Sequence, residues 1–171
     1  AIDQGTTGST VLVVDAQNPK DTRIVGRATV DFPQHYPQAG WVEHDAEEIW
    51  QSVLKAIRCA TQQANASSSF DPTQIHCIGI TNQRETICTF ERKTGKPIAR
   101  AIVWQCRRTT DMCALLRAEG HNEYVQTRTG LVLDPYFSGS KMRWLLENNP
   151  TVRHAVNKGE AVFGTIDSYL I

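Results

Sequence analysis

The sequence lacks long apolar runs and blocks of like charge. Eighteen lysine and arginine residues balance eighteen aspartate and glutamate residues, and the formal net charge is zero. Without a clustered basic surface, the chain has no electrostatic footprint for nucleic acid and no polybasic patch for anionic lipid. No apolar run approaches the roughly 20 residues that a membrane-spanning helix needs. We therefore expect neither nucleic acid nor a membrane as a partner.

Closely spaced cysteines and histidines are also missing. The number of cysteines is odd, and no two have C-x-x-C spacing: Cys59, Cys77, Cys88, Cys106 and Cys113. The five histidines are scattered, without the pairing typical of metal ligands. These absences argue against a disulfide framework and a zinc site, and favour a reducing compartment. We expect a cytoplasmic protein.

What the chain does contain is an alternation of strand and helix patterns. Its 171 residues, 40% of them hydrophobic, are enough for a globular core. Asp45 and Glu48 form a capping-box pattern, and apolar residues follow it at helical spacing, which predicts a helix ending before the serines at 67–69. Further helices are expected at 109–118 and 137–147, and strands at 11–14, 24–32, 75–81, 86–90, 98–104 and 161–166. The pattern indicates an α/β fold.

An arginine and a glutamate stand side by side where one expected strand ends. Arg84 and Glu85 follow the apolar run at 75–80 and precede the strand at 86–90. A guanidinium offers a planar fork of donors and a carboxylate offers acceptors, so together they can hold neighbouring hydroxyl groups of a small polyol. The alternative is a solvated ion pair in a hairpin turn, worth ~0–1 kcal/mol.

A second chemical feature is the glycine- and threonine-rich loop at residues 3–10. Gly5 and Gly8 permit close backbone approaches, and backbone N–H groups with threonine hydroxyls can surround phosphate oxygens. Asp3 could hold magnesium directly or through water. The loop leads into a strand, whereas Walker A and dinucleotide-binding loops lead into a helix. The alternative is a hairpin loop with polar filler.

Several segments in order resemble one family. The phosphate loop at 3–7 is followed by matching segments at 40–45, 79–86, 94–97, 103–105, 134–138 and 163–167. Along its whole length the chain resembles the N-terminal part of the FGGY family of carbohydrate kinases, and residues 82–86 and 135–138 resemble its glycerol-phosphorylating branch. The resemblance implies an actin-like ATPase (ribonuclease H-like) domain, with a mixed sheet and flanking helices. We expect residues 1–171 to be an incomplete piece of a longer protein whose second lobe lies elsewhere.

The resemblance also assigns roles, with glycerol as substrate and ATP and Mg2+ as cofactors. Arg84 and Glu85 would bind glycerol hydroxyls, Tyr136 would add a phenolic hydrogen bond, and Trp104 would pack against the carbon chain. Taken without the family pattern, Trp104 is more often a core residue and Tyr136 a turn residue. Asp3 would position magnesium, and the phosphate-binding residues would be Gly5, Thr6, Thr7, Gly8 and Ser9. Homo-oligomerisation of the longer protein stays open.

The chain departs from the family at two points. Thr10 stands where the family usually has an arginine beside the nucleotide phosphates, and a hydroxyl does not replace a guanidinium fork. The family's catalytic aspartate is expected beyond Ile171. Asp134 fits a helix-entry turn and Asp167 an N-cap, so we take neither as the base. Two alternatives therefore remain: a truncated polyol-binding or interaction module without catalysis, and a kinase for another small sugar.

Overall fold

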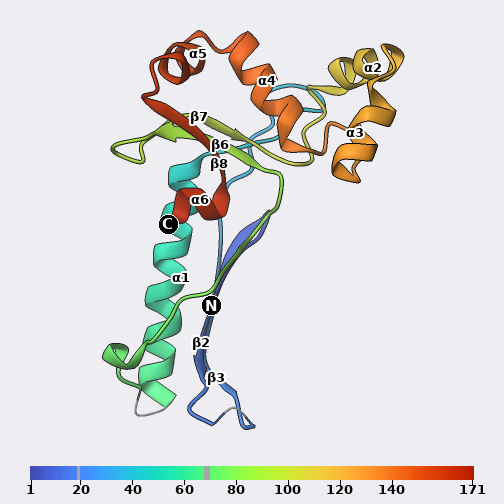
Figure 1. Ribbon diagram of the computed structural model, residues 1–171. Helices are drawn as coiled ribbons and strands as arrows, with labels where there is room; N and C mark the ends of the chain where they lie inside the picture. Colours follow the sequence, from blue (N-terminus) through green and yellow to red (C-terminus); the bar gives the residue numbers. More distant parts are fainter. Residues whose placement is uncertain (19, 68–69) are drawn as a thin grey trace. The chain divides into compact units, whose positions relative to one another are not determined.

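The computed structural model describes residues 1–18, 20–67 and 70–171, and the chain divides into two compact units (Figure 1). Unit 1 comprises Ala1–Pro33, Glu47–Gln83 and Leu170, and unit 2 comprises Gln34–Ala46, Arg84–Tyr169 and Ile171. The chain therefore crosses between the units several times, and one passage from unit 1 to unit 2 is the peptide bond between Gln83 and Arg84.

Unit 1 contains a four-stranded mixed sheet. Its strands are β1 (Ile2–Gln4), β2 (Gly8–Asp15), β3 (Arg23–Asp31) and β5 (Ile80–Asn82), in the order β3-β2-β1-β5. β2 pairs antiparallel with β1 and with β3, and β1 pairs parallel with β5. The mixed sheet expected from the sequence is confirmed, and β2 contains the predicted strand at 11–14.

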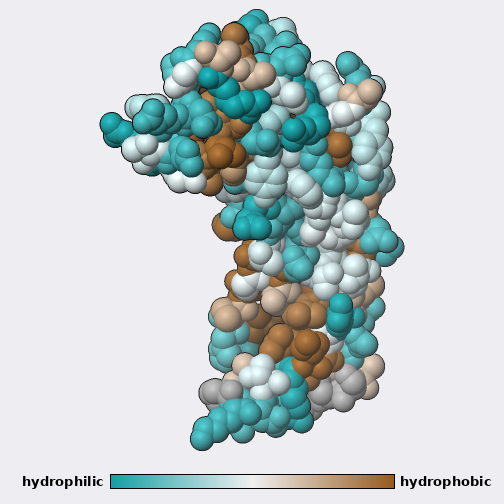
Figure 2. All heavy atoms as spheres, turned by 90° about the vertical axis from the view of Figure 1, so that its right-hand side faces the viewer, coloured by the Kyte–Doolittle hydropathy of each residue, from teal (hydrophilic) through white to brown (hydrophobic). Residues whose placement is uncertain are grey.

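The strand predicted at 75–81 is mostly wrong. A short 3-10 helix, η1 (Pro72–Gln74), precedes residues without regular structure, and β5 begins only at Ile80. β1 begins at Ile2, which lies opposite Ile80 and donates its N–H to the carbonyl of Gly79. Among the described residues, no strand pairs with residues 75–78. Figure 2 shows apolar surface (brown) on unit 1, whose exposed large apolar residues are Val14, Ile24, Ile75 and Ile78.

Helix α1 (Ala46–Ser67) runs alongside the strands of unit 1 (Figure 1). Its buried residues Val53, Ala56 and Ala60 pack with Ile2 and Val11 of the sheet. The helix begins directly after Asp45, as the capping pattern predicts, although it extends to Ser67. The rest of the serine run, at 68–69, lies outside the described residues. Small alanines on the buried face allow the helix to lie close to the strands.

Substitution of Gly26 by alanine is expected to destabilise unit 1. A Cβ at this position in β3 would lie 2.1 Å from the backbone carbonyl oxygen of Ala60 in α1, so strand and helix would have to separate. Overpacking of this kind typically costs about 1–3 kcal/mol. Thermal unfolding should show a lowered Tm, whereas Gly95→Ala, where a Cβ meets no atom within 4 Å but φ is +70°, measures the cost of backbone conformation alone. Equal effects of the two substitutions would contradict the packing argument.

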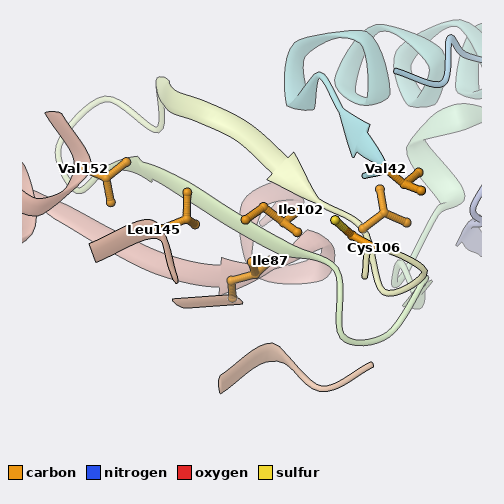
Figure 3. Close-up of a cluster of buried hydrophobic side chains, with 7 residues drawn as sticks. Val42, Ile87, Ile102, Cys106, Leu145 and Val152 are labelled. Carbon is orange, nitrogen blue, oxygen red and sulfur yellow. The ribbon is translucent and has the colours of Figure 1, made fainter. Parts of the chain in front are cut away.

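Unit 2 has an antiparallel sheet of its own. Its strands are β4 (Glu43–His44), β6 (Ile87–Glu91), β7 (Pro97–Ile102) and β8 (Ala161–Thr165), in the order β4-β7-β6-β8. The core beside this sheet contains Val42, Ile87, Ile102, Val103, Cys106, Leu145 and Val152. Figure 3 shows Ile87 and Ile102 at its centre, between Leu145 and Val152 on one side and Val42 and Cys106 on the other.

The helices after β7 are α2 (Thr110–Ala118), α3 (His121–Thr129), α4 (Ser138–Asn148), α5 (Pro150–Asn157) and α6 (Ile166–Leu170). The predictions at 109–118 and 137–147 are confirmed to within one residue. Helix α3 is absent from the helices expected from the sequence, because it buries no residue and so has no apolar stripe. Helix α5 is not among the expected helices either, although Asn149 caps it by accepting the N–H of Val152 and Pro150 opens it.

The predicted N-cap role of Asp167 is wrong. The N-cap of α6 is Thr165, and Asp167 lies in the first turn of the helix. The Thr165 hydroxyl donates to the Asp167 carboxylate, which therefore stabilises the helix start from inside. A carboxylate in the first helical turn is also favoured by the helix dipole.

A buried arginine accounts for two residues of the 40–45 segment, Trp41 and Glu43. The Arg108 side chain is only 2% exposed, and its guanidinium donates to Glu43 at 2.8 Å. The same guanidinium lies 3.9 Å from the ring centroid of Trp41 and 4.7 Å from that of Trp144. A buried charge needs a partner of opposite sign, and aromatic faces add favourable cation–π contact. This segment therefore builds the core of unit 2.

His44, in β4, is fully buried and neutral. Its Nε2 lies 2.6 Å from Oε1 of Gln34, which can only accept, so the ring carries a proton on Nε2. Burial, with a smaller contribution from the charge of His35, lowers the pKa of His44 from 6.5 to about 4. A group with a lowered folded pKa binds fewer protons in the folded than in the unfolded state between these two values.

Acidification is therefore expected to destabilise unit 2 through His44. The contribution of neutral His44 to the free energy of unfolding is fully present above pH 6.5 and is lost as the pH falls toward about 4. From pH 7 to pH 5 the expected loss is about 2 kcal/mol, from 1.36 kcal/mol for each pKa unit. The change in Tm over this range should be smaller in His44→Gln than in the parent. His154→Gln, at an exposed position, is the control and should keep the parent's pH dependence.

The five cysteines are all free thiols, and their exposure differs between the units. Cys59 and Cys77 of unit 1 are exposed, whereas Cys88, Cys106 and Cys113 of unit 2 are buried. Burial raises the pKa of Cys88 to about 12. In residues 1–18, 20–67 and 70–171 no helix is both long enough and apolar enough to span a bilayer.

Candidate functional site

The predicted phosphate loop is a tight hairpin turn in unit 1. Gly5, Thr6 and Thr7 connect β1 to β2, and the N–H of Gly5 donates to the carbonyl of Gly8 at 2.9 Å. A Cβ on Gly8 would lie 2.7 Å from the Asp31 carboxylate, so the glycine permits the close approach of β3. The strand–turn–strand arrangement that separates this loop from Walker A loops is confirmed.

Two buried glutamines hold this turn, and the sequence analysis assigned neither a role. Gln4 donates from Nε2 to the carbonyl of Gly5 at 2.7 Å, and Gln83 donates from Nε2 to Oε1 of Gln4 at 3.1 Å. The N–H of Gln83 also donates to the carbonyl of Gln4 at 2.7 Å. Buried amide groups that satisfy one another in this way fix the backbone around them. Their only sequence signal is their place inside the segments 3–7 and 79–86.

The side chains of the remaining residues of the predicted loop differ in whether they are hydrogen-bonded within the fold or exposed to solvent. The hydroxyl of Ser9 is buried and lies 2.7 Å from that of Ser52, so within the fold this side chain is already bonded. Thr10 lies 2.9 Å from the hydroxyl of Thr29 across the β2–β3 pair. Thr7 and Asp3 are exposed. The exposed carboxylate of Asp3 beside the turn fits magnesium, which typically keeps several waters and uses one or two carboxylates with substrate phosphates.

In unit 2, Glu85 has an unusual backbone and a firmly held side chain. Its φ of +67° makes it the only described non-glycine residue with positive φ. Oε2 accepts the N–H of Ser138 at 2.9 Å and the Ser138 hydroxyl at 2.8 Å, at the first residue of α4. A helix N-terminus favours a carboxylate, and sparsely populated conformations are often found at ligand sites. Ser138 thus holds a residue of the candidate site, a contact that the sequence did not predict.

Trp104 and Tyr136 lie beside one another in unit 2. Their ring centroids are 5.7 Å apart at an interplanar angle of 62°. Trp104 donates its N–H to the Thr86 hydroxyl, next to Glu85, and Tyr136 donates its N–H to Asp134 at 2.8 Å. The helix-entry role of Asp134 is therefore confirmed. These contacts bring Glu85, Trp104 and Tyr136 into one neighbourhood, while Arg84 is exposed next to Glu85.

Unit 2 also contains a cavity of about 430 Å³, but its lining does not match the predicted polyol residues. Glu85 and Asp134 are at its wall, whereas Arg84, Trp104 and Tyr136 are not among the lining residues. Most of the wall is apolar, including Leu116, Val132 and Phe137. A triol needs hydrogen-bonding partners, so this cavity does not suit glycerol. In the described part of the chain, no group of three or more Asp, Glu, His or Cys side chains could hold a metal ion.

Comparison with known proteins decides the family. The model of the N-terminal domain of the FGGY family of carbohydrate kinases matches residues 1–171. The chain belongs to the FGGY family. The sequence-based resemblance is thereby confirmed. Of the segments that carried it, 40–45 contributes Trp41 and Glu43 to the contacts of Arg108, and 79–86 and 134–138 contribute the Glu85–Ser138 contact.

Relatives with similar sequences include glycerol kinases from two Pseudomonas species. The chain is 50% identical over 171 residues to glycerol kinase from Pseudomonas savastanoi pv. phaseolicola and 48% identical over 172 residues to glycerol kinase from Pseudomonas entomophila. These alignments cover 100% of this chain but 32% and 33% of the relatives, so the chain spans about a third of their length.

A solved structure confirms the expected FGGY fold. The crystal structure of Plasmodium falciparum glycerol kinase with ADP superposes with a TM-score of 0.90 at 34% identity, over 99% of this chain and 32% of that one. The α/β, actin-like ATPase fold that the sequence resemblance implied is therefore confirmed.

Proposed function

We propose that this chain supplies the phosphate loop and the polyol-binding residues of an enzyme that transfers a phosphoryl group from ATP to glycerol. The single observation that carries the proposal is the Glu85 carboxylate, which is held at the start of α4 beside the Trp104–Tyr136 pair. Ser138 occupies Oε2, and among the described residues no hydrogen bond to Oε1 is found, so this oxygen can accept from a glycerol hydroxyl. The similarity to glycerol kinases supports the substrate.

The proposed division of labour follows the two units. In unit 2, Arg84 donates to glycerol hydroxyls, Glu85 accepts from them, Trp104 covers the carbon chain and Tyr136 adds a phenolic hydrogen bond. In unit 1, backbone N–H groups of the 5–9 turn, with the Thr6 and Thr7 hydroxyls, contact the phosphates of ATP. Asp3 would hold magnesium, directly or through water, and the metal when bound neutralises charge on the phosphates.

The reaction moves one phosphoryl group and one proton. A terminal hydroxyl oxygen of glycerol forms a bond to the γ-phosphorus of ATP, the bond from that phosphorus to ADP breaks, and the hydroxyl proton passes to a base. Asp134 is engaged with the N–H of Tyr136 and with Arg107, and Asp167 with Thr165, so we assign neither as the base. The proposed base lies outside these 171 residues. Such transfer depends mainly on positioning and charge stabilisation.

The test uses the protein from the complete reading frame that contains this chain. With ATP and magnesium it should form glycerol 3-phosphate, and in a panel with a pentose and gluconate it should prefer glycerol. Absence of any ATP-dependent product would overturn the proposal. A preference for another substrate would support the alternative of a kinase for another small sugar.

Thr10 motivates a second candidate, a polyol-binding module without catalysis. Its hydroxyl is paired with Thr29 at the position where the family usually has an arginine near the nucleotide. Calorimetric binding of glycerol without turnover, together with a reading frame that stops after Ile171, would favour this candidate over the kinase.

A further inference from the structure

Lys141 is a fully buried charged residue for which the sequence analysis and the proposed mechanism have no role. It lies on α4, one turn after Ser138, and its side chain is 0% exposed. Its ammonium group donates to the carbonyl of Pro135, to that of Tyr136 at 2.9 Å and to that of Phe137 at 3.4 Å. An ammonium has three N–H donors, so three successive carbonyls use all of them.

These three carbonyls belong to the segment that presents the aromatic ring of the candidate site. Tyr136 packs edge-on against Trp104 and, at 5.1 Å between centroids, against Phe137. Ser138, which follows Phe137, holds the Glu85 carboxylate. Lys141 therefore ties the backbone on which Tyr136 sits to the same helix that orients Glu85.

Stability alone does not account for this lysine. Burying an ammonium group costs several kcal/mol, and its hydrogen bonds and nearby charges largely offset that cost, so the buried group adds little net stability. Near a helix N-terminus a positive charge is also unfavourable. A buried charge that contributes little to stability but fixes three consecutive carbonyls fits a role in precise placement.

We propose that Lys141 is a positioning residue that fixes Tyr136, and with it the orientation of the bound polyol. The inference rests on the proposed function for its catalytic consequence, but its structural part does not. Lys141 does not touch the reacting atoms, and it acts by restricting residues 135–137.

The charge state of Lys141 offers an additional readout. Burial lowers its pKa from 10.5 to about 8, while the nearby Cys106, Glu85, Cys113 and Asp134 act in the opposite direction. Above this pH the neutral amine has two N–H donors for three carbonyls. The KM for glycerol in the parent protein should therefore rise as the pH passes about 8. The same rise should be absent from a variant without the amine.

The experiment compares Lys141→Met with the parent in the full-length protein, and Lys93→Met, at an exposed turn position, is the matched control. Lys141→Met should accelerate amide hydrogen exchange in residues 134–138 and lower kcat/KM for glycerol by about 10- to 100-fold, as small misplacements do. The KM for ATP should stay at the parent value. Tyr136→Phe should have a smaller effect in the Lys141→Met background than in the parent, because both changes act on one contact.

The outcomes separate this inference from the proposed function. A parent without glycerol phosphorylation overturns the proposed function, and hydrogen exchange then still decides whether Lys141 holds the segment. Unchanged exchange in residues 134–138 overturns the inference. Faster exchange in these residues with unaltered glycerol kinetics also overturns it. Additive effects of Lys141→Met and Tyr136→Phe on kcat/KM for glycerol overturn it as well.

Discussion

Replacement of Arg84 by alanine is expected to lower the apparent affinity for glycerol by about 2–4 kcal/mol, roughly 30- to 1,000-fold, because it removes charge-assisted hydrogen bonds to the polyol. Arg84 is an exposed residue, so an incoming ligand can reach its side chain. Since the proposed role concerns the polyol alone, the KM for ATP should change little. Steady-state kinetics with glycerol and ATP varied separately would measure both values.

The control for this substitution is Arg100→Ala, an exposed arginine on β7 of the same unit. It removes an equal charge from the surface without touching the candidate site, and should leave glycerol kinetics unchanged. If Arg84→Ala behaves like Arg100→Ala, Arg84 is a solvated surface residue, and the ion-pair alternative from the sequence analysis is the better description.

The second large effect is expected for Glu85→Gln. The amide oxygen keeps the contacts with the N–H and hydroxyl of Ser138, while the other half of the group changes from an acceptor to a donor. Loss of hydrogen bonds to a charged acceptor costs about 1.5–3 kcal/mol, which corresponds to a fall of roughly 10- to 150-fold in kcat/KM for glycerol. Kinetics and Tm should be measured together, with Glu123→Gln on α3 as the exposed control.

The comparison of Tm with kinetics decides what Glu85 does. A Tm near the parent value with weakened glycerol kinetics supports direct contact with the polyol. A lowered Tm with unaltered kinetics would mean that Glu85 serves only to cap α4.

The sequence predicted most of the fold because its patterns are local. The periodic residues of α1 and the turn residues at 5–8 act through neighbours in the chain, and both predictions were confirmed. The strand at 75–81 failed for a non-local reason, since its pairing depends on how many residues β1 offers opposite it. Helix α3 failed because a helix that buries nothing has no apolar period to detect.

For the candidate site, sequence reasoning identified residues that a ligand would touch but not those that hold them. Arg84, Glu85, Trp104 and Tyr136 lie in recognisable segments, and their roles remain predictions. Gln83, Ser138 and Lys141 support the site through contacts that only folding creates, such as the bond from Gln83 to Gln4, 79 residues away. A buried lysine in particular is read from sequence as a surface residue, because that is where most lysines are found.

The uneven distribution of the thiols has a practical consequence. An alkylating reagent applied under native conditions meets this chain only at Cys59 and Cys77, because the other three side chains are shielded and thiolate formation at Cys88 is suppressed. Modification at Cys88, Cys106 or Cys113 then reports that unit 2 has opened, so peptide mapping after labelling can follow the local unfolding of unit 2 without any engineered probe, with Cys59 and Cys77 as internal standards for complete reaction.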